Sequence, residues 1–157
     1  GREEAKTILP SKDYIIPLGK ARQVIAAQST YINNGESCVI VTYGMGVYWA
    51  KAAAKNFPGQ IEIVDLRTLF PLDEALVFAT VKKHGKCLIL TEEQQNNSFA
   101  EALAGRISKD CFKYLDAPVE VLGALNLPAV PMNVVLEKAM LPGAEKVAAR
   151  VESLLNS

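Results

Sequence analysis

The sequence contains little of the chemistry that metal sites and disulfide frameworks require. Among its 157 residues there are three cysteines and one histidine, and there is no Cys-x-x-Cys pair. Structural zinc sites use four cysteine or histidine ligands, often in closely spaced pairs, so this scarcity argues against such a site. Cys38 and Cys87 each begin an apolar segment, where a free cysteine behaves as a small hydrophobic residue, and Cys111 stands alone. Unclustered cysteines in odd number are typical of a reducing compartment, so we expect a cytoplasmic protein.

The sequence also lacks net charge and long apolar runs. Its 17 basic and 17 acidic side chains cancel, which argues against a nucleic-acid surface or a polybasic membrane patch. The apolar runs have the length of strands, whereas a membrane-spanning helix needs about 20 apolar residues. Four of the first six residues are charged and no apolar run of signal length follows them, so we expect no signal peptide. We therefore expect neither nucleic acid nor a membrane as a partner.

A strand, a helix and a second strand form the centre of the predicted fold. Residues 38–43 are apolar or β-favouring and uncharged, which is typical of a strand buried on both faces. Gly44 and Gly46 end this strand, and residues 47–57 then have apolar side chains at helical spacing. Residues 61–66 form the next predicted strand. Short connections of this kind indicate a βαβ unit with parallel neighbouring strands.

Further strands extend this sheet on both sides. Residues 86–91 and 119–123 have the composition of buried parallel strands. Residues 22–27 indicate a short edge strand, and the turn signal Asn33-Asn34-Gly35 predicts a hairpin that pairs it antiparallel to the central strand, residues 38–43. We expect residues 1–13 to be a linker or disordered end and residues 14–157 to form one domain.

Two helix starts have clear sequence signals. Pro71 is the predicted first residue of a helix, and Asp73 and Glu74 then complement the helix dipole in its first turn. Ser98 precedes Glu101 by three residues, which is the spacing of a capping box. A structural role therefore accounts for Ser98 better than a nucleophilic one.

The pair Gly44 and Gly46, between a strand and a helix, is also found in dinucleotide-binding turns. The third glycine of that motif falls at position 49, which is Trp49. A tryptophan fills the space that close packing of the helix on the sheet requires. We interpret Gly44 and Gly46 as a structural turn, and keep nucleotide binding as the alternative.

The remaining polar residues do not form a recognisable catalytic group. His84 stands at a predicted helix end, where capping of exposed carbonyl groups is its expected role. Asp65 and Arg67 lie two residues apart at a strand end, where a structural ion pair is expected. Glu92 and Glu93 are candidates for acid–base chemistry, but adjacent residues leaving a strand point in different directions. We expect a solvated or partner-facing polar loop over residues 92–97.

Five segments, in this order, resemble the carboxy-terminal domain of transketolase-like, thiamine-diphosphate-dependent enzymes. The segments are Pro17–Ala21, Val41–Gly44, Asp65–Asp73, Tyr114–Pro118 and Leu136–Pro142. Within that group the sequence is most similar to the beta subunit, or fused beta half, of the decarboxylating first component of 2-oxo acid dehydrogenase complexes. The resemblance covers residues 14–155.

This resemblance implies a three-layer α/β/α domain around a mostly parallel five-stranded sheet with one antiparallel edge strand. It implies a parent enzyme that oxidatively decarboxylates pyruvate or a branched-chain 2-oxo acid and transfers the acyl group to lipoyl groups. In that family thiamine diphosphate and Mg²⁺ lie between two other domains. The present chain has no Gly-Asp-Gly with a downstream asparagine to hold a metal-bound diphosphate. We therefore expect no catalytic, cofactor-binding or metal-ligating residue in it.

The resemblance leaves contact with partners as the predicted role. The partners implied are the enzyme's own catalytic domains or alpha subunit, a second copy of the domain, and the acyltransferase second component. Parallel sheets meet partners at the carboxyl ends of their strands, and aromatics with a polar tip are favoured in interfaces. The interface we predict consists of Tyr48, Trp49, Glu92, Glu93 and Gln94. Two alternatives stay open: both rings pack beneath the arm Tyr14–Leu18, or the chain is a free-standing small-molecule-binding or nucleotide-binding domain that uses the Gly44–Gly46 turn.

Overall fold

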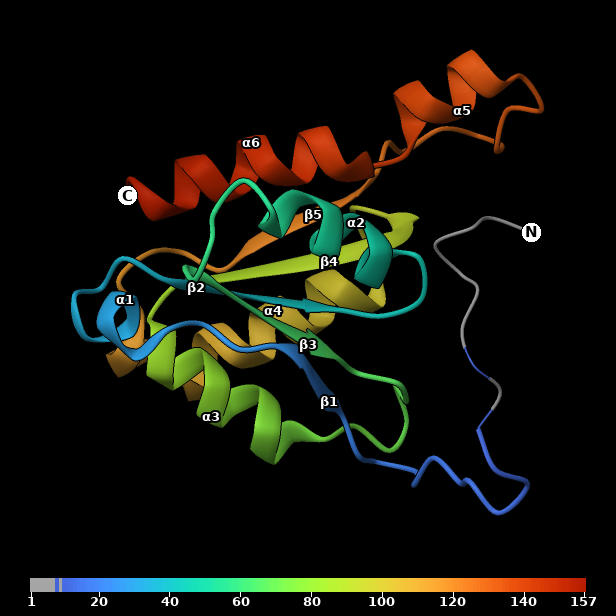
Figure 1. The fold of residues 1–157 in the computed structure, drawn as a ribbon. Coiled ribbons are helices and arrows are strands. Elements are labelled where there is room, and N and C mark those ends of the chain that lie inside the picture. Colours follow the sequence, from blue (N-terminus) through green and yellow to red (C-terminus); the bar gives the residue numbers. More distant parts are fainter. Residues whose placement is uncertain (1–7, 9) are drawn as a thin grey trace.

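The described part of the chain folds around one five-stranded sheet (Figure 1). The computed structural model describes residue 8 and residues 10–157. The strands are β1 (Arg22–Ile25), β2 (Cys38–Thr42), β3 (Ile61–Asp65), β4 (Cys87–Gln94) and β5 (Glu120–Ala124). Their order across the sheet is β1-β3-β2-β4-β5. β3, β2, β4 and β5 run parallel, and β1 runs antiparallel to β3 at the edge, which confirms the predicted sheet.

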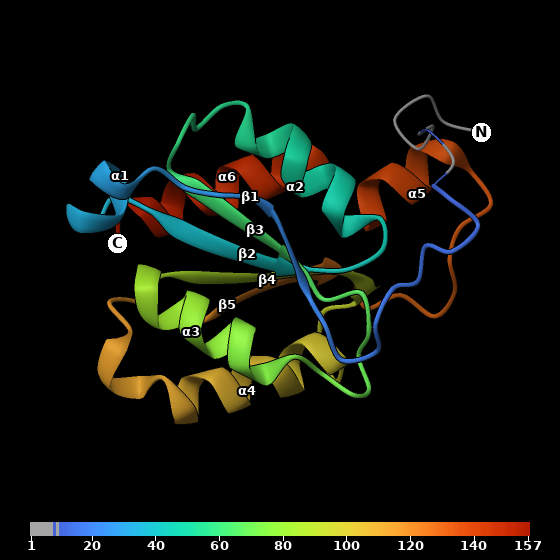
Figure 2. The same ribbon diagram turned by 60° about the horizontal axis from the view of Figure 1, so that its bottom comes forward.

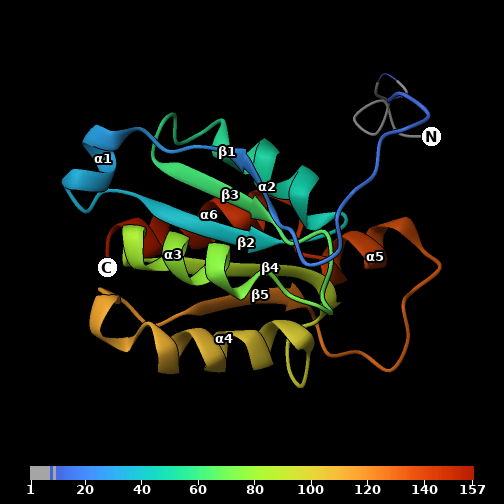
Figure 3. The same ribbon diagram turned by 90° about the horizontal axis from the view of Figure 1, so that it is seen from below.

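Helices cover both faces of the sheet and complete three layers. They are α1 (Ser29–Asn33), α2 (Gly46–Ala54), α3 (Glu74–His84), α4 (Phe99–Asp110), the 3-10 helix η2 (Phe112–Tyr114), α5 (Val134–Met140) and α6 (Gly143–Leu155). α2 and α6 pack on one face, and α3 and α4 pack on the other (Figures 2 and 3). α5 projects beyond the sheet at its carboxyl edge, away from these layers (Figure 1).

The core lies in two apolar layers, one on each side of the sheet. Ile40 and Leu88 belong to the layer beneath α2 and α6, whereas Val39, Val41 and Ile89 belong to the layer above α3 and α4. Successive strand residues point to opposite faces, so a strand that is covered on both faces must be apolar at every position. This requirement explains the uninterrupted apolar runs of β2 and β4.

The three cysteines lie inside this core. Cys38, Cys87 and Cys111 are free and buried. Burial raises the pKa of all three thiol groups, that of Cys38 to about 12. Because the thiolate is the reactive form, these are structural rather than reactive cysteines.

The predicted partner of the edge strand is wrong. β1 pairs with β3, with Arg22 opposite Asp65 and Gln23 opposite Val64, and not with the central strand β2. A short helix, α1, and a turn at Gly35 (φ 70°) replace the predicted hairpin. The physical reason is that β2 already lies between β3 and β4, so both of its hydrogen-bonding edges are occupied. The only edge left on that side of the sheet belongs to β3.

The start of α3 also differs from the prediction. Pro71 lies in the preceding loop, and Asp73 is the cap of a helix that begins at Glu74. Asp73 Oδ1 accepts a hydrogen bond from the backbone N–H of Leu76 at 3.2 Å. Its Oδ2 accepts from the N–H of Ala21 at 3.0 Å. One carboxylate therefore begins α3 and fixes the segment that enters β1.

His84 is buried and does not cap the end of α3, contrary to the prediction. Ser37 Oγ lies 2.7 Å from His84 Nδ1, and His84 Nε2 lies 3.0 Å from Glu62 Oε2. Lys83 and Gln23 also donate hydrogen bonds to the Glu62 carboxylate. Burial alone raises the pKa of Glu62, but the hydrogen bonds from His84, Lys83 and Gln23 outweigh it and lower that pKa to about 2. The network joins α3 to the amino ends of β2 and β3.

Candidate interaction surface at the carboxyl edge of the sheet

The two turn glycines shape the start of α2 at the carboxyl edge. Gly44 adopts a φ of 57°, in the left-handed region. A Cβ at Gly46 would collide with Thr42 Oγ1, which donates a hydrogen bond to the Leu90 carbonyl at 2.8 Å. A Cβ at Gly44 would lie 3.8 Å from a carboxylate oxygen of Glu92. A phosphate at this turn would face that negative charge, which argues against the alternative nucleotide site.

Tyr43 links the ends of β2 and β4 to the start of α4. Its hydroxyl shares a hydrogen bond of 2.8 Å with Thr91 Oγ1 and donates to Glu93 Oε2 at 3.5 Å. Glu93 Oε2 also accepts from the N–H of Phe99 at 3.3 Å, and the rings of Tyr43 and Phe99 meet edge to face with centroids 6.0 Å apart. Burial, together with the nearby Glu93 carboxylate, raises the pKa of Tyr43. The phenol therefore acts as a neutral structural donor.

The predicted polar loop is in part a strand. β4 continues through Gln94, which pairs with Ala124 of β5. A Cβ at Gly123 would lie only 2.7 Å from the Glu93 carbonyl oxygen, so the two chains approach closely there. The side chains of Glu92, Glu93 and Gln94 are exposed. They form a polar rim on the carboxyl edge beside the turn that begins α2.

Ser98 caps α4 through its side chain. Ser98 Oγ accepts a hydrogen bond from the N–H of Glu101 at 3.1 Å. The Glu101 carboxylate accepts from the N–H of Asn97 at 2.6 Å, so the second bond of the capping box reaches one residue further back than the usual pattern. The left-handed φ of 55° at Asn97 turns its N–H into position. The cap fixes where the polar rim ends and α4 begins.

The Asp65 side chain binds the backbone of Arg67 rather than its guanidinium. Asp65 Oδ1 accepts from the N–H of Arg67 at 3.0 Å, and Arg67 adopts a φ of 57°. The guanidinium instead donates to the Tyr14 hydroxyl at 3.5 Å, and Thr68 Oγ1 accepts from the N–H of Gly19 at 2.9 Å. These bonds hold the segment before β1 against the loop that follows β3.

Apolar side chains are exposed along this same edge. Tyr14, Ile15, Ile16 and Leu18 precede the antiparallel β1, and Phe70 follows β3, so the topology brings them together at the carboxyl edge. The segment after β5 adds more, and α5 carries its exposed residues away from the sheet (Figure 1). The carboxyl-edge apolar surface consists of Tyr14, Ile15, Ile16, Leu18, Phe70, Leu125, Leu127, Val130, Met132, Val134, Val135 and Leu136. One feature of the sequence could have indicated this surface. Residues 125–136 are rich in apolar side chains but belong to no buried strand or helix.

The structure gives the two predicted interface aromatics different surroundings. Trp49 is half-buried and packs against the core layer beneath α2 and α6. Tyr48 is half-buried and lines an open groove between α2 and the edge strands. The arm Tyr14–Leu18 is itself largely exposed, with Ile15 at 78% and Leu18 at 75%. Neither the core layer that Trp49 packs against nor the groove that Tyr48 lines includes a residue of the arm, so the structure does not support the alternative that both rings lie beneath it.

The described residues form neither a metal site nor a membrane-spanning helix. In residues 8 and 10–157, no group of three or more histidine, cysteine, aspartate or glutamate side chains could hold a metal ion. No helix in this part has both the length and the apolar character required to cross a bilayer. The fold and the edge together define a class of protein: a three-layer α/β/α domain that exposes apolar side chains at the carboxyl edge of its sheet.

Comparison with known proteins agrees with this class. The family model described as "Transketolase, C-terminal domain" matches residues 27–147, and the chain belongs to this family. The chain is 32% identical over 149 residues to the 2-oxoisovalerate dehydrogenase subunit beta of Bacillus subtilis, covering 93% of the chain and 43% of that protein. It is 32% identical over 145 residues to the pyruvate dehydrogenase E1 component subunit beta of Rhizobium meliloti, covering 90% of the chain and 30% of that protein.

A solved structure shares the fold. A split-gene transketolase, in an inactive beta4 tetramer, superimposes with a TM-score of 0.72 and 18% identity over 96% of this chain and 46% of that one. The chain thus spans less than half the length of the proteins that it matches. The similarity covers a carboxy-terminal domain and not the whole of these enzymes.

Proposed function

We propose that this chain is the assembly domain of a thiamine-diphosphate-dependent 2-oxo acid dehydrogenase. The parent enzyme oxidatively decarboxylates pyruvate or a branched-chain 2-oxo acid and transfers the acyl group to a lipoyl group. Support comes from the beta subunits of pyruvate and 2-oxoisovalerate dehydrogenases, which are similar over at least nine-tenths of the chain. A cytoplasmic location is part of the proposal, supported by three free, buried cysteines.

The observation that carries the proposal is the carboxyl-edge apolar surface. Single exposed apolar side chains are common on soluble proteins, but many of them gathered at one edge of a sheet support a contact site. On α5, Val134, Val135 and Leu136 are 63%, 74% and 57% exposed, although they lie in a regular helix. The exposed Glu92, Glu93 and Gln94 supply a polar rim beside it. An apolar centre with a polar rim is the usual anatomy of a protein interface.

The partners proposed for this surface are the catalytic domains or alpha subunit of the same enzyme and a second copy of this domain. The acyltransferase second component is a further partner of the assembled enzyme. Thiamine diphosphate and Mg²⁺ belong to the catalytic domains in this proposal. The chain offers no carboxylate cluster for a metal among its described residues and no diphosphate motif in its sequence. Its own contribution is therefore binding and positioning.

The test uses self-association of the 157-residue chain, measured by light scattering across a concentration series. We expect the wild type to dimerise, and Val135→Glu combined with Leu136→Glu to raise the dimer dissociation constant by about thirtyfold or more, because charges replace apolar anchors. Phe112→Glu is the matched control, since Phe112 is 76% exposed at the opposite edge. Equal association of wild type and the α5 variant would contradict the role of this surface in dimerisation.

A further inference from the structure

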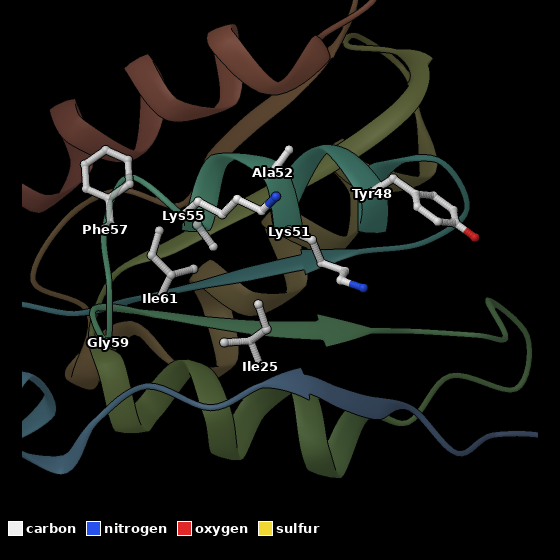
Figure 4. Close-up of a pocket in the computed structure, with 9 residues that line it drawn as sticks. Ile25, Tyr48, Lys51, Ala52, Lys55, Phe57, Gly59 and Ile61 are labelled. Carbon is white, nitrogen blue, oxygen red and sulfur yellow. The ribbon is translucent and has the colours of Figure 1, made fainter. Parts of the chain in front are cut away.

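A groove runs along α2 on the side of the sheet away from α3 and α4. Its volume is about 510 Å³, within the ~300–1,000 Å³ of small-molecule sites. Ile25 of β1 and Ile61 of β3 point from the strands toward α2 and form the floor (Figure 4). α2 ends at Ala54, a turn before the predicted end, and Phe57 closes the groove there. The groove exists because α2 and α6 cover the centre of this face, leaving the β1–β3 edge open (Figure 2).

Two positively charged lysines lie at the opening of this groove, near its apolar floor. Lys51 lies on α2, and Lys55, one turn later, is the residue that follows the helix. Both lysines line the groove together with Tyr48 (Figure 4). Both lysines are exposed, and neither forms an ion pair with another described residue. The groove therefore offers two ammonium groups near an apolar floor, whereas the Tyr48 hydroxyl at the end of α2 points away from that floor (Figure 4). An occupant complementary to it has one negative head and a short apolar body.

We propose that this groove binds a small carboxylic acid with an aliphatic body. Lys51 and Lys55 bind the carboxylate, and the aliphatic body lies on the apolar floor of the groove, against Ile25. The groove lining includes no arginine and no helix N-terminus, which are the groups that commonly recognise phosphate. The site is separate from the carboxyl-edge apolar surface, so this proposal stands or falls independently of the assembly function.

The experiment uses the 157-residue chain and three probes: hexanoate, its uncharged counterpart hexanamide, and acetate, which has the charge without the body. Binding is followed by amide chemical shifts in ¹H–¹⁵N spectra. We expect saturable shifts centred on α2 and β3 with hexanoate, and much weaker binding of the other two. Raising the salt concentration should weaken hexanoate binding, because the cations are exposed.

Matched variants test the residues. Lys51→Gln combined with Lys55→Gln should raise the dissociation constant of hexanoate roughly tenfold, the equivalent of two exposed ion pairs. Lys109→Gln combined with Lys113→Gln should leave it unchanged, since these lysines are also exposed and four residues apart but lie on another face. Ile25→Thr keeps a β-branched side chain in the edge strand and leaves both lysines in place. It should therefore weaken hexanoate binding only through the loss of apolar contact at the floor of the groove.

Three outcomes would overturn the proposal. If hexanamide bound as tightly as hexanoate, the negative charge of the ligand would have no role in binding. Equal losses in the two lysine pairs would indicate a general effect of surface charge rather than a site. A change of self-association in the Lys51→Gln, Lys55→Gln variant without any hexanoate binding would assign the groove to a protein partner instead.

Discussion

At the residue scale, the start of α4 depends on one hydroxyl group. Ser98 Oγ accepts from the N–H of Glu101 at 3.1 Å and also donates to the Gln95 carbonyl at 3.1 Å. Ser98 is 5% exposed, so an alanine methyl group at this position would keep water from the uncapped N–H groups. The first N–H groups of a helix have no intrahelical partner, which is why capping residues affect stability.

A comparison of two substitutions of Ser98 should distinguish the effect of losing the capping hydrogen bond from the effect of losing the side chain. We expect Ser98→Ala to lower the free energy of unfolding by ~1 kcal/mol, and Ser98→Gly by only a few tenths, because glycine at this position leaves the end groups open to water. Denaturant melts measure both. Equal losses from the two variants would mean that the cap contributes little.

The buried Glu62 gives the fold a specific acid sensitivity. Its pKa is about 2 in the folded chain, against an ordinary value of 4.5, so folding favours the carboxylate. This stabilisation is fully present above pH 4.5 and is lost as the pH falls toward 2. Glu62→Gln should flatten that loss in a series of denaturant melts, whereas Glu152→Gln, at an exposed position, should leave the loss unchanged.

At neutral pH the same substitution should also destabilise the fold. We expect Glu62→Gln to cost on the order of 2 kcal/mol, below the ~3–5 kcal/mol of a fully buried ion pair, because the Lys83 side chain is 39% exposed. If Glu62→Gln kept the full acid sensitivity of the wild type, another carboxyl group would have to be responsible.

At the scale of elements, α2 presents different faces to the core, to the groove and to the carboxyl edge. Ala50 and Ala53 are buried against the sheet, whereas Lys51 and Lys55 lie on the exposed side. Trp49 and Tyr48 are adjacent and therefore point about 100° apart around the helix. This geometry gives Trp49 a packing role and leaves Tyr48 for the groove.

The two aromatics should accordingly differ in their effect on stability. Trp49→Ala should lower the free energy of unfolding by about 2 kcal/mol, less than the ~3–5 kcal/mol of a fully buried ring because Trp49 is only half-buried. Tyr48→Ala should cost well under 1 kcal/mol. Thermal melts of the two variants provide the measurement, and similar losses would show that both rings are core residues.

At the scale of the whole molecule, the surface proposed to contact partners lies on the carboxyl edge of the sheet. The antiparallel β1 enters the sheet there, and the loops after β3, β4 and β5 leave from the same edge. The segments that carry these exposed apolar side chains are far apart in sequence. The arm before β1 and the segment from β5 to α5 nevertheless lie on the same side of the molecule (Figure 3). In the proposed function, this exposed surface is the one through which the domain joins a larger assembly.

The 157-residue chain should not bind thiamine diphosphate by itself. A ligand at a hundred times its dissociation constant stabilises a fold by about 2.7 kcal/mol, which produces a clear rise in melting temperature. We expect no such rise with millimolar thiamine diphosphate and Mg²⁺, because the diphosphate motif is absent from the sequence. A reproducible increase would place part of the cofactor site in this domain.

Much of the fold follows from local patterns in the sequence. The apolar runs of β2, β3 and β4, the glycines of the turn before α2, and the spacing of Ser98 and Glu101 each specify an element through interactions between near neighbours. The βαβ unit adds the parallel pairing, because its crossover has a preferred hand. The absence of paired cysteines and of a diphosphate motif is likewise visible without the structure.

Long-range packing decided the rest. Which strand edges remain free for hydrogen bonding depends on the arrangement of the whole sheet. β1 therefore pairs with β3, although its own sequence does not distinguish β3 from β2 as a partner. His84 stands beside Gly85, a local signal for a helix end, and only the folded chain brings Ser37 and Glu62 to its ring. The carboxyl-edge apolar surface and the groove along α2 have the same origin. Apolar character is a property of single residues, but exposure depends on which elements the tertiary structure places on top of them.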